Sequence, residues 1–339
     1  MQPLKIGTRE SELAVWQAKQ VQTLLKQNSV TSELVFINSE GDVDLITPLY
    51  EMGVQGIFTK TLDAALLNKR IDIAVHSMKD VPTQLAKGIK QASVLKRGSY
   101  KDILVLHPDL SERKALVLVK YATLGRHDKG KRSDWTLPLR EHRDKPGEPE
   151  DVVIATSSIR RIAQWLNHYS HHKIVNLRGN VNTRLRKLKE SSWHGAIFAA
   201  AGLERLNLRP KNSIELDWML PAPAQGAIMV VCREDDRVSF EACQNFNDAD
   251  TALCTKVERD FLRTLLGGCS TPISALARIR KDKITLKGSI CSVDGKELTS
   301  VQRSSTKVDG GQLGIDTANL LLTTNHAQHI MQTIRNEKS

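Results

Sequence analysis

The sequence predicts an α/β protein with two or three compact units, and three observations lead to that prediction. At 339 residues the chain is longer than one average domain. Short apolar strands alternate with helices in the first hundred residues and again from about Asp151 to Val231. A stretch with a different order, in which one long helix precedes further strands, follows from about Asp248.

The first unit reads as strand, helix, strand, helix, strand. Strands are expected at 4–8, 33–38 and 71–75, and Ser11 is a suitable N-cap for an amphipathic helix that continues to Leu25. A second helix is expected at 58–67. This order predicts a mostly parallel sheet with helices on both of its faces.

The second and third units are read in the same way. In the second unit the expected strands are 152–155, 173–176, 196–200 and 227–231, and the expected helices are 158–168 and 181–189. The third unit is expected to begin with a helix from about Asp248 to Leu265, to continue with strands at 275–279 and 283–287, and to close with a helix from about Gln312.

Between Leu106 and Glu150 a segment rich in charges of both signs and in turn residues is interpreted as a solvated insertion, with a binding element as the alternative.

The composition limits the classes of function. The formal net charge is +11, which is usual for a nucleic-acid binder, but aromatic residues make up only 4% and no zinc-finger, zipper or RNP-like pattern is present. The alternative partner is a small and heavily anionic molecule. No apolar run approaches the length of a membrane span and no leader precedes the first strand, so a cytoplasmic location is expected.

The five cysteines are expected to be reduced. None belongs to a Cys-x-x-Cys pair, so no metal site is predicted. They are Cys232, Cys243, Cys254, Cys269 and Cys291.

Arginines gather where predicted strands end and helices begin. They occur in the runs Gly7–Ser11, Thr156–Arg161, Leu177–Leu185 and Ala199–Arg205. The carboxyl ends of strands line the ligand crevice of such a sheet, and helix N-termini attract anions. Arginine at a helix N-terminus opposes the helix dipole, a conflict that a ligand carboxylate would resolve. This placement favours a polycarboxylate ligand over nucleic acid.

One carboxylate is expected within this cationic cleft. The run His76–Pro82 follows an apolar strand and contains Lys79 and Asp80 side by side. A turn with a surface ion pair is one interpretation. In the other, Asp80 accepts a hydrogen bond from an N–H group of the ligand and stabilises positive charge or transfers a proton.

The last run is Leu266–Pro272, in which two glycines precede Cys269 and allow a tight turn. The residue pattern alone indicates a loop cysteine that could be reactive. Taken together, these runs in this order and spacing resemble the signature motifs of the hydroxymethylbilane synthase (porphobilinogen deaminase) family. The resemblance covers about Leu4 to Asp102 and Val152 to Ala277, and the remaining C-terminal part more weakly.

The resemblance implies a transferase of tetrapyrrole (haem, porphyrin) biosynthesis. Members of the family carry a dipyrromethane cofactor on a cysteine, here Cys269, through a thioether. They deaminate four porphobilinogen molecules, add them one at a time, and release hydroxymethylbilane by hydrolysis. Asp80 would assist the loss of ammonia and stabilise the azafulvene-like cation.

The resemblance also assigns residues that bind cofactor and substrate. Arg9 and Ser11 would lie at the incoming substrate, and Phe58 would lie beside the pyrroles. The remaining residues would hold side-chain carboxylates or complete the cleft, and they are Lys79, Thr156, Ser157, Ser158, Arg160, Arg161, Arg178, Asn180, Arg184, Gly202, Arg205 and Gln225.

The fold that the resemblance implies has two α/β domains like those of type II periplasmic binding proteins, joined by a hinge, and a smaller C-terminal α+β domain. The expected boundaries are 1–100 with 225–242, 102–222 with an insertion at about 107–150, and 248–339. Glu40, Glu51 and Gln55 depart from the basic residues that are common in the family. The chain is expected to be a monomer with porphobilinogen as substrate, no metal, and no nucleic-acid or membrane partner. The alternative is a non-catalytic polycarboxylate-binding protein of the same fold.

Overall fold

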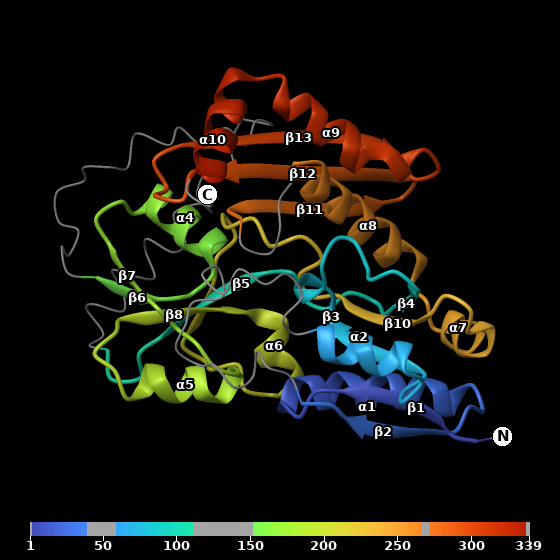
Figure 1. Cartoon of the computed structure of the whole chain (residues 1–339). Coiled ribbons are helices and arrows are strands. Elements are labelled where there is room, and N and C mark those ends of the chain that lie inside the picture. The colour runs from blue at the N-terminus through green and yellow to red at the C-terminus, as the bar shows by residue number, and fades with distance from the viewer. Residues whose placement is uncertain (1, 39–58, 111–151, 266–270, 337–339) are drawn as a thin grey trace.

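Three separate β-sheets organise the chain, as the computed structural model shows (Figure 1). The structure describes residues 2–38, 59–110, 152–265 and 271–336. Two sheets have five strands each and the third has three. Among the described residues, no helix is long and apolar enough to cross a membrane.

The first sheet combines strands from both ends of the first 250 residues. Its strands follow the order β2-β1-β3-β10-β4, and β1 is parallel to β2 and β3 whereas β10 is antiparallel to its two neighbours. The strands are β1 (Leu4–Thr8), β2 (Ser32–Phe36), β3 (Ile73–Ser77), β4 (Ile89–Val94) and β10 (Ile228–Arg233). The helices of this unit are α1 (Glu12–Gln27), α2 (Lys60–Leu67) and α7 (Arg237–Gln244).

The second sheet repeats the same topology. Its order is β7-β6-β8-β5-β9, with β6 parallel to β7 and β8, and β5 antiparallel to β8 and β9. The strands are β5 (Asp102–Leu106), β6 (Val153–Ala155), β7 (Lys173–Val175), β8 (Gly195–Ala199) and β9 (Ser213–Glu215). The helices are α4 (Ile159–His168), α5 (Val181–Lys189) and α6 (Ala200–Arg205). Each sheet therefore holds one antiparallel strand contributed across the junction between the two units.

The chain crosses between these two units twice, and the two crossing segments lie side by side. Gly98 N–H donates to the carbonyl of Gly226 at 3.0 Å, and Leu95 N–H donates to that of Ile228 at 3.0 Å. Gly226 has φ +87°, and a Cβ there would lie 2.5 Å from the Ser99 carbonyl oxygen. Only glycine permits this close approach of the two segments. The two segments join the first two units at the junction that the family resemblance describes as a hinge.

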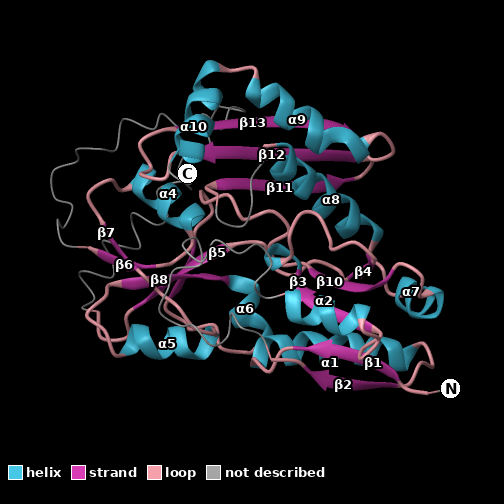
Figure 2. Ribbon diagram, viewed as in Figure 1, coloured by secondary structure: helices cyan, strands magenta, loops and turns pink. Residues whose placement is uncertain are grey.

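The third unit is an antiparallel sheet packed against helices (Figure 2). Its strands are β11 (Ile273–Arg280), β12 (Lys283–Cys291) and β13 (Leu298–Thr306). Its helices are α8 (Ala249–Thr264), α9 (Leu313–Leu322) and α10 (Asn325–Asn336). Phe261 of α8 is fully buried in this core, and Gly288 on β12 leaves room for its ring.

Glu258 of α8 ties the third unit to the hinge. Its carboxylate is fully buried and accepts two hydrogen bonds from Arg97, at 2.6 and 3.1 Å. It also accepts from the N–H groups of Ala224, at 2.6 Å, and Ala277, at 2.7 Å. Ala224 has φ +62°, a conformation that is costly for a residue with a Cβ and that these contacts help to hold.

The predicted fold class is confirmed, since two α/β units with mostly parallel strands are accompanied by a smaller unit of strands and helices. The expected elements lie within a few residues of the observed ones. Sequence periodicity missed β4, β5, β9, α7, β13 and α10. The domain boundaries themselves stay a prediction.

Candidate functional site

A cleft of about 220 Å³ lies between the first two units. The residues around it come from the carboxyl ends of β1, β3 and β8, the N-terminal side of α5, and the hinge. Its lining includes these residues of the predicted site: Arg9, Ser11, Lys79, Asp80, Arg161, Arg178, Asn180, Arg184, Gly202, Arg205 and Gln225. The expectation that strand ends would gather the arginines in one crevice is therefore confirmed for these residues.

The cations of the cleft are partly removed from water. Burial, together with the neighbouring charges of Arg161 and Arg178, lowers the pKa of Arg184 to about 10, although Asp80 opposes the shift. Burial lowers the pKa of Arg205 to about 10 and that of Lys79 to about 8, although Asp80 opposes the shift at Lys79. Clustered, desolvated positive charge is unfavourable by itself, so an anion entering the cleft would be stabilised.

Backbone contacts hold two of these arginines in place. Arg184 Nε donates to the carbonyl of Gly179 at 2.7 Å, and Arg205 Nη2 donates to that of Gly226 at 2.7 Å. The Arg205 guanidinium also lies over the ring of Trp16, 5.7 Å from its centroid. Arg205 on α6 therefore contacts both the hinge and the first helix of the chain.

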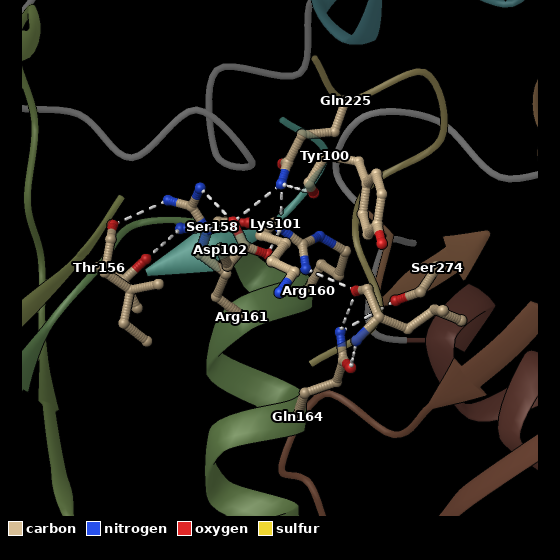
Figure 3. A network of polar contacts seen from close by, with 12 residues as sticks. Tyr100, Lys101, Asp102, Thr156, Ser158, Arg160, Arg161, Gln164, Gln225 and Ser274 are labelled. Atoms are coloured by element: carbon tan, nitrogen blue, oxygen red, sulfur yellow. Dashed lines mark hydrogen bonds and ion pairs between the residues drawn. The ribbon is translucent and has the colours of Figure 1, made fainter. Parts of the chain in front are cut away.

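A buried carboxylate, Asp102, holds the first turn of α4 (Figure 3). Arg161 donates to its Oδ1 from Nε at 3.0 Å and from Nη2 at 2.7 Å, and Arg160 Nη2 lies 2.8 Å from its Oδ2. The Gln225 side-chain amide donates to the same Oδ1 at 3.0 Å. Asp102 is the first residue of β5, so this cluster joins α4, the second sheet and the hinge.

This geometry adds a partner that the sequence interpretation did not include. A ligand carboxylate was expected to offset the two arginines in the first turn of α4, and the carboxylate found against both is that of Asp102. Arg161 still lines the cleft, whereas Arg160 donates to the carbonyl of Leu220 at 2.8 Å and is not part of the described lining. The two neighbours thus differ in the direction their side chains take from the helix.

We expect Asp102→Asn to destabilise the fold by about 3–5 kcal/mol, because removing one partner leaves buried charge uncompensated. Burial by itself raises the pKa of Asp102, but Arg160, Arg161 and Lys79 outweigh it and hold that pKa below its usual range. The wild-type carboxylate therefore contributes stability above its unfolded pKa of about 4, and this contribution is lost as the pH falls through the lower folded pKa.

Urea unfolding at neutral pH and at acidic pH checks this prediction. The difference between Asp102→Asn and wild type should shrink at acidic pH, where the wild-type carboxylate becomes protonated. Asp217→Asn is the matched control, since Asp217 pairs with Lys101 on the surface, with 34% of its side chain exposed, and should cost less than about 1 kcal/mol. Equal effects of the two substitutions would contradict the buried clamp.

Other predicted residues lie outside the described lining of the cleft. Ser157 Oγ accepts a hydrogen bond from the Leu177 N–H at 2.8 Å and donates one to Asn176 Oδ1. Thr156 Oγ1 accepts a hydrogen bond from the Ser158 N–H at 3.3 Å. Ser158 is the N-cap of α4, where its side chain makes no capping hydrogen bond. The predicted carboxylate-binding roles of these hydroxyls stay predictions. Phe58, Cys269, Glu40, Glu51 and Gln55 lie outside the described residues.

Sequence reasoning missed Asp102 and Glu12 as cleft-related residues. The apolar run after Asp102 marks a strand, but nothing near it in the sequence indicates that its partners lie on α4 and in the hinge. Glu12 lines the cleft and accepts from the Asn182 side-chain amide at 2.6 Å, so it joins the first and second units at the mouth. In the sequence, Glu12 follows the N-cap of α1, a position where an acidic residue is common in any helix, so nothing there indicated a cleft.

The four described cysteines have the character of buried apolar residues. Burial raises the pKa of Cys232 to about 11 and those of Cys243, Cys254 and Cys291 to about 12. Their reactive thiolate forms are therefore strongly disfavoured near neutral pH. Among the described residues, the cleft is lined by many guanidinium groups and by only two carboxylates, Asp80 and Glu12, which suits a ligand with several carboxylates.

Two family models match almost the whole chain. One describes the porphobilinogen deaminase dipyrromethane cofactor binding domain and matches residues 4–241, and the other describes the porphobilinogen deaminase C-terminal domain and matches residues 252–323. The chain is 36% identical over 341 residues to the porphobilinogen deaminase of Acidithiobacillus ferrooxidans, with 98% of each chain covered. It is 35% identical to that of Syntrophomonas wolfei, with 98% of this chain and 99% of the relative covered.

The solved structures that the chain matches include the methionine binding protein MetQ. That chain shares 14% identity with this one at a TM-score of 0.40, and the match covers 74% of this chain and 91% of the other. The family matches favour the enzyme over the alternative of a non-catalytic polycarboxylate-binding protein.

Proposed function

Since the chain belongs to the porphobilinogen deaminase family, and so condenses porphobilinogen into hydroxymethylbilane, we propose that Asp80 is its catalytic carboxylate and Cys269 its cofactor anchor. The observation that carries this proposal is the position of Asp80. It is a carboxylate on the wall of a cleft whose other charged walls are mostly cationic. A carboxylate in such a setting can accept a hydrogen bond from a pyrrole N–H. The carboxylate groups of the ligand can meanwhile pair with the surrounding cations.

The dipyrromethane cofactor of this family supplies the primer on which the pyrrole chain grows. We propose that a thioether from Cys269 holds it. The buried state of the four described cysteines supports this choice, because their raised pKa values make them poor nucleophiles. Arg161, Arg178, Arg184 and Arg205 would then bind acetate and propionate groups, each through charge-assisted hydrogen bonds.

Incoming porphobilinogen would be met by Arg9 and Ser11 at the carboxyl end of β1. Asp80 would hydrogen-bond its pyrrole N–H and stabilise the positive charge that develops as ammonia leaves. Lys79 would hold a carboxylate next to it, and its pKa of about 8 keeps most of its charge at neutral pH. The proposal includes a cytoplasmic monomer that has porphobilinogen as its substrate and neither nucleic acid nor membrane as a partner.

Turnover of porphobilinogen by the purified full chain tests the function. Mass spectrometry should find the linear tetrapyrrole hydroxymethylbilane, with about four ammonia molecules released for each product molecule, as the family's stoichiometry requires. Competition by simple polycarboxylates should raise KM without lowering kcat, because they compete only for binding. Ammonia release without any tetrapyrrole would contradict the proposed condensation.

A further inference from the structure

The loop that carries Asp80 is held by a side chain from the third unit. Arg259 of α8 donates from Nη1 to the carbonyls of Met78, at 3.3 Å, and Val81, at 2.9 Å. Its Nη2 donates to the carbonyl of Pro82 at 2.6 Å. The three carbonyls lie on either side of Lys79 and Asp80, so one guanidinium spans the short 3₁₀ turn Met78–Asp80.

This contact is well placed to control the turn. Arg259 is only 9% exposed, and hydrogen bonds from a charged donor in such a setting are stronger than those between neutral groups. A pocket of about 430 Å³ lies beside it, lined by Met78, Leu85, Met229 and residues of α8. The turn therefore borders an open groove on this side, and the planar guanidinium bridges from α8 to the backbone there.

The same helix leads into the segment with Cys269. Helix α8 ends at Thr264, shortly before that cysteine in the sequence. We propose that Arg259 is a positioning residue that fixes the Asp80 turn relative to the helix leading to the cofactor anchor. This inference rests on the proposed roles of Asp80 and Cys269. Arg259 contacts neither substrate nor cofactor in this account and acts only through the backbone of the turn.

The test compares Arg259→Gln and Arg259→Lys with Arg263→Gln. Arg263 lies on the same helix, pairs with Asp260 and has 52% of its side chain exposed, so its substitution should leave turnover unchanged. For Arg259→Gln we expect kcat to fall by about 10–100-fold with KM within about twofold, because a displaced catalytic group lowers the rate more than the binding. The kcat of Arg259→Lys should lie between those of wild type and Arg259→Gln, because one ammonium group cannot reproduce the planar guanidinium.

Two further readouts separate positioning from a general structural role. Hydrogen exchange of the amides in 78–81 should accelerate in Arg259→Gln, while the cofactor mass stays attached and exchange in β11–β13 stays the same. The double variant Asp80→Asn/Arg259→Gln should be no slower than Asp80→Asn alone, because residues acting as a unit are not additive.

The outcomes are distinct from those of the proposed function. A normal rate in Asp80→Asn alone would overturn the catalytic role of Asp80, whatever Arg259 does. With Asp80→Asn impaired, a normal kcat in Arg259→Gln, or additive losses in the double variant, would overturn the positioning role. Loss of folded protein in both Arg259 variants would equally overturn it, in favour of a purely structural role.

Discussion

Asp80→Asn should lower kcat by roughly 10²–10⁴-fold while the protein keeps its fold and its cofactor. Asparagine has nearly the same shape, so it preserves the packing of the turn Met78–Asp80. It lacks the negative charge that would stabilise a developing cation among the surrounding arginines, and it cannot accept a proton. Single-turnover measurement of ammonia release, together with the intact mass of the variant, checks this expectation.

The control for that experiment is Asp235→Asn, which removes an exposed carboxylate outside the described lining of the cleft. Its kcat should match wild type. KM of Asp80→Asn should change much less than kcat, because the carboxylates of the substrate are bound by the cations rather than by Asp80. Near-normal turnover in Asp80→Asn would remove this residue from its proposed role and leave the arginine cleft without a catalytic group assigned.

Cys269→Ser should abolish turnover and remove a mass excess equal to one dipyrromethane from the purified chain. A serine hydroxyl is far less nucleophilic than a thiolate near neutral pH, so the covalent attachment should fail. Intact mass spectrometry of wild type and variant measures the attachment directly and does not depend on an activity assay. A folded wild-type chain of unmodified mass would contradict the anchor.

Cys254→Ala is the matched control for this substitution. Cys254 is 7% exposed in the core of the third unit, and burial raises the pKa of its thiol to about 12. The variant should keep the mass excess and show turnover close to wild type after allowing for any loss of stability from the smaller side chain. Loss of the mass excess in Cys254→Ala, with retention in Cys269→Ser, would reassign the anchor.

Much of the candidate site was predictable because its residues lie in short runs directly after strands. The run with Lys79 and Asp80 follows β3, and the run with Arg178 and Arg184 leads into α5. Local periodicity identifies such strand ends, and the geometry of parallel sheets brings the ends together. These residues could thus be expected to line one shared cleft from the sequence alone.

The partners of Arg160 and Arg161 could not be predicted in this way. The two arginines are adjacent and equivalent in sequence, yet Arg161 faces the cleft while Arg160 contacts the Leu220 carbonyl. Both contact Asp102, which lies on strand β5, far from them in the sequence. Buried ion pairs between distant segments leave no periodic signal, so they emerge only when the elements pack.

The sequence by itself determined many of the strands and helices, the gathering of cations at strand ends and the placing of Asp80 among them, because these follow from local patterns and sheet geometry. The tertiary structure alone decided the clamp on Asp102 and the contact of Arg259 with the Asp80 turn. These features depend on which surfaces of separate units meet. That is a property of packing among segments far apart in the chain, and no local run of residues encodes it.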